Sequence, residues 1–177
     1  MSFALKKTTL KNPAKLLSAT ILTLMLTSCY AGARSENMVV GTMPSADFGK
    51  YTHNIAVAHT ANDTRWDSRI SEKDFRAALT NSLYYNNLLN DQSPEYQLDA
   101  NVVKLTPPSM DFDMYVTADV QYVIHDIQSG KIIVDKTIET RAAASEHDEA
   151  LITDRKRVAN ERVMAQNFQD FINYLRR

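Results

Sequence analysis

The chain has 177 residues, with 20 Lys and Arg against 21 Asp and Glu and a hydrophobic content of 44%. This composition is typical of a globular protein with one domain, and it excludes a disordered, collagen-like or disulfide-stapled chain. Four Gly and five Pro also argue against a glycine-rich phosphate loop. The remaining class is a small mixed domain, and composition alone does not name its activity.

The amino terminus has the pattern of a secretory signal. Residues 1–28 carry four Lys and no acidic residue, and the apolar run 16–26 precedes Cys29 by two residues. Eleven helical residues rise only about 16 Å, roughly half the thickness of a bilayer core, so this run is too short for a permanent span. We therefore predict that residues 1–28 are a signal peptide that is removed.

The four residues Leu26-Thr27-Ser28-Cys29 resemble the lipobox of bacterial lipoproteins, in which the Cys becomes the lipid-modified first residue of the mature chain. Cys29 is the only Cys, and a lone Cys in an exported protein has no disulfide partner. Tyr30 follows it instead of an Asp, which in enterobacterial lipoproteins implies sorting to the outer membrane. The resemblance implies a membrane anchor of acyl chains on Cys29, with the domain facing the periplasm or the cell surface.

Removal of the signal peptide changes the formal net charge from −1 to −5, because the lost charges are all Lys. The mature chain is acidic and has no basic patch with interleaved aromatic residues, which disfavours nucleic-acid binding. Residues 29–48 are small and polar except for Met38-Val39-Val40. We predict that they form a flexible, lipidated tether and that residues 49–177 form a periplasmic domain.

The predicted domain begins with a strand and a helix. Residues 54–60 have the alternation of a short strand. Ser71 is a candidate N-cap for an amphipathic helix that continues to about Tyr85. Asn86-Asn87 should end this helix, because Asn tolerates the left-handed conformation of a C-terminal cap.

Three strands and a closing helix follow. Apolar and polar residues alternate over residues 96–102, 114–124 and 131–141, and residues 128–130 are turn formers that join the last two strands as a hairpin. In the third of these strands, the alternation assigns to the apolar face Ile132, Val134 and Ile138. Asp154 is expected to open a helix whose apolar stripe is Met164, Phe168, Phe171, Ile172 and Leu175.

These elements predict an α+β fold in the order β-α-β-β-β-α. Two helices with one apolar stripe each and a sheet with one apolar face form a two-layer sandwich, in which both helices cover the same face of an antiparallel-rich sheet. The other face of the sheet should be open to water.

Three stretches together resemble a family of small Gram-negative envelope lipoproteins, most of them uncharacterised. They are Asp74–Leu89, Gly130–Ile138 and Arg157–Leu175, and none of them is a catalytic motif. The element order is also similar to that of the amino-terminal domain of TolB and of auxiliary lipoproteins in lipid and lipopolysaccharide transport. This second likeness is an analogy of fold only.

The sequence predicts no enzyme, cofactor or metal site. Its four His residues have no metal-ligand spacing, and no G-x-S-x-G motif marks a nucleophile. His147-Asp148-Glu149 is the densest cluster of possible metal ligands, but adjacent residues cannot all face one ion, so we interpret it as a solvated loop.

The more informative feature is the polar face of the predicted sheet. Pleat alternation collects on it candidate docking residues, namely Asp99, Tyr115, Asp119, Gln121, Asp135 and Glu139. The simpler interpretation is that they form the wet side of an antiparallel sheet. Two functions are open at this point: a non-catalytic accessory or scaffold subunit of an envelope complex with a protein partner, or a carrier of a lipid or other hydrophobic molecule, which needs an apolar cavity.

Overall fold

The computed structural model of the chain describes residues 32–44, 47–62, 64, 70–106, 113–149 and 151–176. Its main elements are, in chain order, β1 (Ile55–Asn62), α3 (Glu72–Tyr85), β2 (Tyr96–Leu105), β3 (Met114–Asp126), β4 (Ile132–Ala144) and α4 (Ile152–Leu175). A short helix, α2 (Ser35–Met38), and a 3-10 turn, η1 (Gly49–Tyr51), precede them. The predicted order β-α-β-β-β-α is confirmed, and the predicted signal peptide lies outside the described residues.

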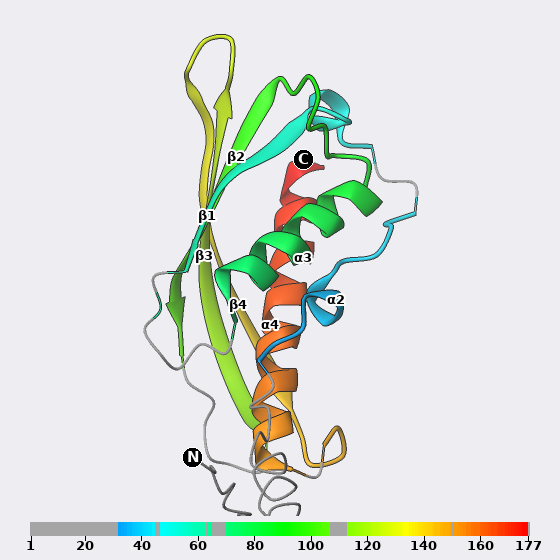
Figure 1. Cartoon of the computed structure of the whole chain (residues 1–177), viewed down its shortest axis with the longest axis vertical. Coiled ribbons are helices and arrows are strands. Elements are labelled where there is room, and N and C mark those ends of the chain that lie inside the picture. The colour runs from blue at the N-terminus through cyan, green and yellow to red at the C-terminus, as the bar shows by residue number, and fades with distance from the viewer. Residues whose placement is uncertain are drawn as a thin grey trace, which may run out of the picture. The chain divides into compact units, whose positions relative to one another are not determined.

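The four strands form one sheet in the order β1-β2-β3-β4. β1 and β2 are parallel, and α3 connects them, whereas β2, β3 and β4 are antiparallel neighbours. Figure 1 shows α3 and α4 on the same side of this sheet. The predicted two-layer α+β sandwich with an antiparallel-rich sheet is therefore confirmed.

Local signals explain where α3 begins and ends. The backbone N–H of Asp74 donates to the Ser71 hydroxyl oxygen at 3.0 Å, which is the predicted N-cap. Asn87 has a φ of 56°, the left-handed conformation expected after the helix. Between these ends the helix buries one face, formed by Phe75, Ala78, Leu79, Ser82 and Leu83.

Helix α4 supplies most of the second layer of the core. It begins at Ile152, two residues before the predicted Asp154, and its N-cap residue Leu151 makes no side-chain cap. The predicted stripe is fully buried or nearly so. Aromatic rings fill the space between helices and sheet: Phe168 lies 5.3 Å from Phe75, and Phe171 stacks on Tyr122 at 3.9 Å between ring centroids.

One polar cluster ties α4 to β3 and β4 within the core. The Tyr122 hydroxyl donates to Asn167 Oδ1 at 2.7 Å, and Asn167 Nδ2 donates to the Ile138 carbonyl at 2.8 Å. Burial, and to a smaller extent the charge of Asp170, raises the pKa of Tyr122 well above its usual value. The phenol therefore stays protonated and remains a hydrogen-bond donor.

The prediction of a flexible tether at residues 29–48 is wrong for the part that the structure describes. Helix α2 lies against α3 and α4 (Figure 1), and the segment around it contributes to the core the side chains of Ala33, Met38, Val40 and Phe48. The sequence shows only a short apolar patch here, so the burial depends on surfaces that the two helices provide.

Hydrogen bonds hold this segment against both helices. The Val40 N–H donates to the Ser82 hydroxyl oxygen of α3 at 2.9 Å, and the Arg34 N–H donates to Glu161 Oε1 of α4, also at 2.9 Å. These bonds satisfy backbone donors that lie beside the core. The packed domain therefore begins at about Ala33 instead of residue 49.

The prediction for Ile132 is also wrong. Its side chain is 56% exposed, whereas Val134 is buried as predicted. The pairing of β3 with β4 shifts between Ile124 and His125, so Ile132 lies opposite His125 instead of continuing the inward alternation. This irregularity moves Ile132 to the outer side of the strand.

Candidate docking surface

The six predicted docking residues come together on the open face of the sheet, which is the face opposite α3 and α4. They are supplied by three neighbouring strands as Asp99 on β2, Tyr115, Asp119 and Gln121 on β3, and Asp135 and Glu139 on β4. Val123 lies between Asp99 and Asp135, and Asp119 pairs directly with Glu139. Asp99 and Asp135 therefore flank Val123 on its two sides, and Asp119 and Glu139 are direct cross-strand neighbours four residues away along β3.

Basic and polar side chains lie beside these carboxylates. Lys104 Nζ lies 3.9 Å from Asp119 Oδ2, and His125 Nε2 lies 3.4 Å from Asp99 Oδ2. Between β3 and β4, Gln121 Nε2 donates to Asp135 Oδ1 at 2.9 Å. The surface is thus a mixture of acidic, basic and polar side chains in which acidic groups predominate.

At one end of the open face, an arginine side chain packs over a tyrosine ring. The guanidinium carbon of Arg141 lies 4.2 Å from the centroid of the Tyr115 ring, and the Tyr115 residue is 41% exposed. This is cation–π geometry at a solvent-accessible site. Tyr and Arg are residues that protein interfaces favour, so this end suits contact with a partner.

Sequence reasoning missed three members of the surface, Lys104, His125 and Arg141. The predicted alternation already places His125 and Arg141 on the polar side of their strands, although neither was named as a docking residue. Lys104 had no such signal, because the pairing of β2 with β3 shifts between Val102 and Lys104 and brings Lys104 opposite Asp119.

The carboxylates of the open face differ in how far a partner can reach them. The side chains of Asp99 and Asp119 are 34% and 21% exposed, and one oxygen of each is buried without a hydrogen-bond partner. Asp135 and Glu139 are exposed. They lie on β4, an edge strand of this sheet, so β4 presents the most accessible negative charge.

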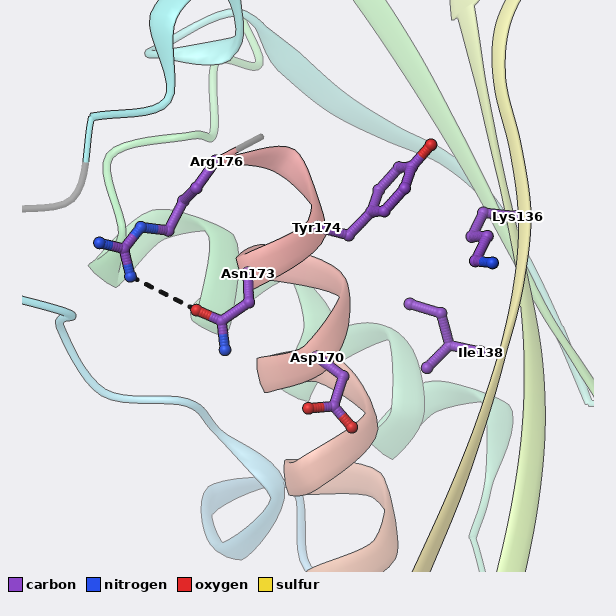
Figure 2. A pocket seen from close by; sticks show the side chains of 6 residues that line it. All are labelled: Lys136, Ile138, Asp170, Asn173, Tyr174 and Arg176. Carbon is purple, nitrogen blue, oxygen red and sulfur yellow. Dashed lines mark hydrogen bonds between the residues drawn. The ribbon is translucent and has the colours of Figure 1, made fainter.

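The described surface also has hollows, and the one between β4 and the end of α4 has a mainly polar lining. Figure 2 shows one between β4 and the end of α4, where Tyr174 and Ile138 point into the space between the two elements. It is lined by Lys136, Ile138, Asp170, Asn173, Tyr174 and Arg176. Such a lining does not match the apolar cavity that a lipid carrier needs.

The acidic loop before α4 makes ion pairs with that helix. Asp148 pairs with Arg162, and Glu149 lies 3.7 Å from Arg157. The bonds from Arg162, then from Ser145, hold the pKa of Asp148 well below its usual value. Within the described ranges, no group of three or more His, Cys, Asp or Glu side chains is placed to hold a metal ion.

Neither α3 nor α4, nor any shorter described helix, combines the length and the apolar character needed to cross a bilayer.

No protein-family model and no curated protein matches this sequence. Protein XCC0632 from Xanthomonas campestris, of family DUF330, has a similar fold, with a TM-score of 0.61 and 9% identity over 78% of this chain and 91% of that chain. The PelC dodecamer from Paraburkholderia phytofirmans gives a TM-score of 0.54 and 14% identity over 75% of this chain and 93% of that chain. For a minor lipoprotein from Acinetobacter baumannii the TM-score is 0.44 and the identity is 13%, over 71% of this chain and 91% of that chain. At 9% and 14% identity, the likeness to XCC0632 and to PelC is one of fold alone.

Proposed function

We propose that the protein is an outer-membrane lipoprotein that serves as a non-catalytic accessory or scaffold subunit of a cell-envelope complex. The observation that carries this proposal is the open face of the sheet, where polar and acidic side chains from three strands form a continuous surface. A surface of this kind suits recognition of another protein through complementary charge. The lipobox-like residues before Cys29 support an acyl anchor.

The packing of the core favours this role over that of a hydrophobic carrier. A carrier would hold its ligand between the helices and the sheet, but there Phe168 packs on Phe75 and Phe171 stacks on Tyr122. Large rings in contact leave the ligand no room without repacking. The likeness to the TolB amino-terminal domain stays a prediction. PelC has a similar fold and forms a dodecamer, so an assembly of several copies is one form of the proposed complex.

Charge reversal of Asp135 and Glu139 tests the docking surface. Both side chains are exposed on β4, whereas Asp119 is partly buried beside Lys104 and is less suited to reversal. The double variant D135K/E139K should reduce capture of the partner from solubilised envelopes several-fold, and the loss should shrink at high salt. The measurement is a quantitative pull-down at two salt concentrations.

The matched control is D91K/E95K, which makes the same change of net charge at exposed residues before β2. It should capture the partner as well as the parent does. Circular dichroism should show that both variants are folded. Equal capture by D135K/E139K and D91K/E95K would remove the open face as the docking surface.

A further inference from the structure

The correction to the predicted tether limits how far the domain can stand from the membrane. Ala33 is only 4% exposed and belongs to the core. Cys29 precedes it by four residues, and four residues of fully extended chain span at most about 14 Å. An acyl anchor on Cys29 therefore holds the bilayer surface close to the point where the chain enters the domain.

The entry point lies beside the amino-terminal half of α4. Glu161 receives hydrogen bonds from the Arg34 N–H and from Asn37 Nδ2, both at 2.9 Å. Arg34 also lines the same hollow as Glu149 and Arg157, next to the loop that leads into α4. In Figure 1 the blue start of the described chain runs along this part of the helix.

Exposed apolar side chains mark the nearby end of α4. Leu151 is 64% exposed and Ile152 is 49% exposed. With helical spacing, Ile152 begins the row that continues through Lys156 to the buried Ala159 and Val163. The first residue of the core-facing stripe of α4 is therefore exposed to solvent, whereas the later ones are buried.

The charges around these two side chains are compatible with an anionic surface. Arg155 and Lys156 follow Ile152 by three and four residues, which places them on the same side of the helix. Among the nearby acids, Asp148, Glu149 and Asp154 are paired with arginines of α4, so part of their charge is already offset, and Glu146 adds a further negative charge in the same loop. Basic residues beside exposed apolar ones are typical of surfaces that lie on phospholipid.

We propose that the amino-terminal end of α4, formed by Leu151 and Ile152 with Lys156, rests on the bilayer that holds the Cys29 anchor. This inference depends on the anchor of the proposed function. Leu151 and Ile152 enter the headgroup region, and the Lys156 ammonium meets lipid phosphates. β3 runs away from this end for about 40 Å, so the β3–β4 turn points away from the membrane and the open face stays accessible from the side.

Two matched label positions test this orientation. Ile152 and Ile132 are isoleucines of similar exposure, 49% and 56%, at opposite ends of the domain. The acylated sulfur of Cys29 does not react with thiol labels, so I152C and I132C each supply one reactive thiol in the mature protein. Each variant is labelled with an environment-sensitive fluorophore and reconstituted in phosphatidylethanolamine–phosphatidylglycerol vesicles that carry nitroxide-labelled acyl chains.

The expected result is several-fold stronger quenching, and a blue-shifted emission, for the label at position 152 than for the label at position 132. Equal quenching, or stronger quenching at position 132, would overturn the proposed orientation. Flotation of the protein with the vesicles is measured first. Loss of flotation contradicts the anchor itself, whereas flotation with the wrong quenching pattern contradicts only the orientation.

Discussion

Replacement of Phe168 by Ala should lower the free energy of unfolding by about 3–5 kcal/mol, the usual cost of truncating a fully buried Phe. Phe168 is completely buried in the middle of α4, and its ring contacts that of Phe75 on α3. The truncation leaves a cavity where the two helices meet above the sheet. It also removes a ring pair that contributes beyond its buried area.

The neighbouring Gln169→Ala is the matched control, because Gln169 is exposed on the same turn of the same helix. It should change the free energy of unfolding by less than about 0.5 kcal/mol. Denaturant melts of a soluble chain that begins at Tyr30 measure both values. If the two variants unfold at the same denaturant concentration, Phe168 does not hold the core position that the structure assigns to it.

Replacement of Glu161 by Ala should cost about 3 kcal/mol, because it removes the buried carboxylate that pairs with Arg157 and leaves that arginine only the more exposed Glu149 and Asp154, 3.7 and 3.8 Å away. Glu161 is 3% exposed and accepts two hydrogen bonds of 3.1 Å from the buried Arg157. It also accepts the bonds from Arg34 and Asn37 that attach the start of the domain to α4. The variant should therefore loosen residues 33–40 as well as destabilise the whole fold.

Glu149→Ala gives the comparison for this prediction. Glu149 faces the same arginine at 3.7 Å, but its side chain is 40% exposed, so its loss should cost no more than about 1 kcal/mol. Amide hydrogen exchange adds a local readout: the Val40 N–H should exchange faster in E161A than in E149A, beyond the difference in global stability. Equal protection in the two variants would mean that Glu161 does not hold the entry segment.

The elements that sequence reasoning predicted well carry their signal locally. The Ser71 cap, the left-handed Asn87 and the alternation of β3 are each set by a few adjacent residues, and the structure confirms them. The order of elements then restricts the fold to a sheet covered by two helices on one face.

The features that it missed depend on contacts between distant residues. Met38 is buried because α3 and α4 provide a surface for it, and no pattern in the residues around Met38 predicts that surface. Lys104 and Ile132 lie on unexpected faces because strand pairing shifts beside them, and such a shift reverses the alternation. The acidic members of the open face were therefore predicted, and Lys104 was missed because a bulge places it there.

The acyl anchor on Cys29 is the central claim, because the proposed role and the proposed orientation both depend on it. Its most direct test is the intact mass of the protein extracted from envelopes. We predict the mass of residues 29–177 plus acyl chains, and we expect a Cys29→Ala variant to lack this form. An unmodified chain that begins elsewhere, or the full 177 residues without lipid, would contradict the account.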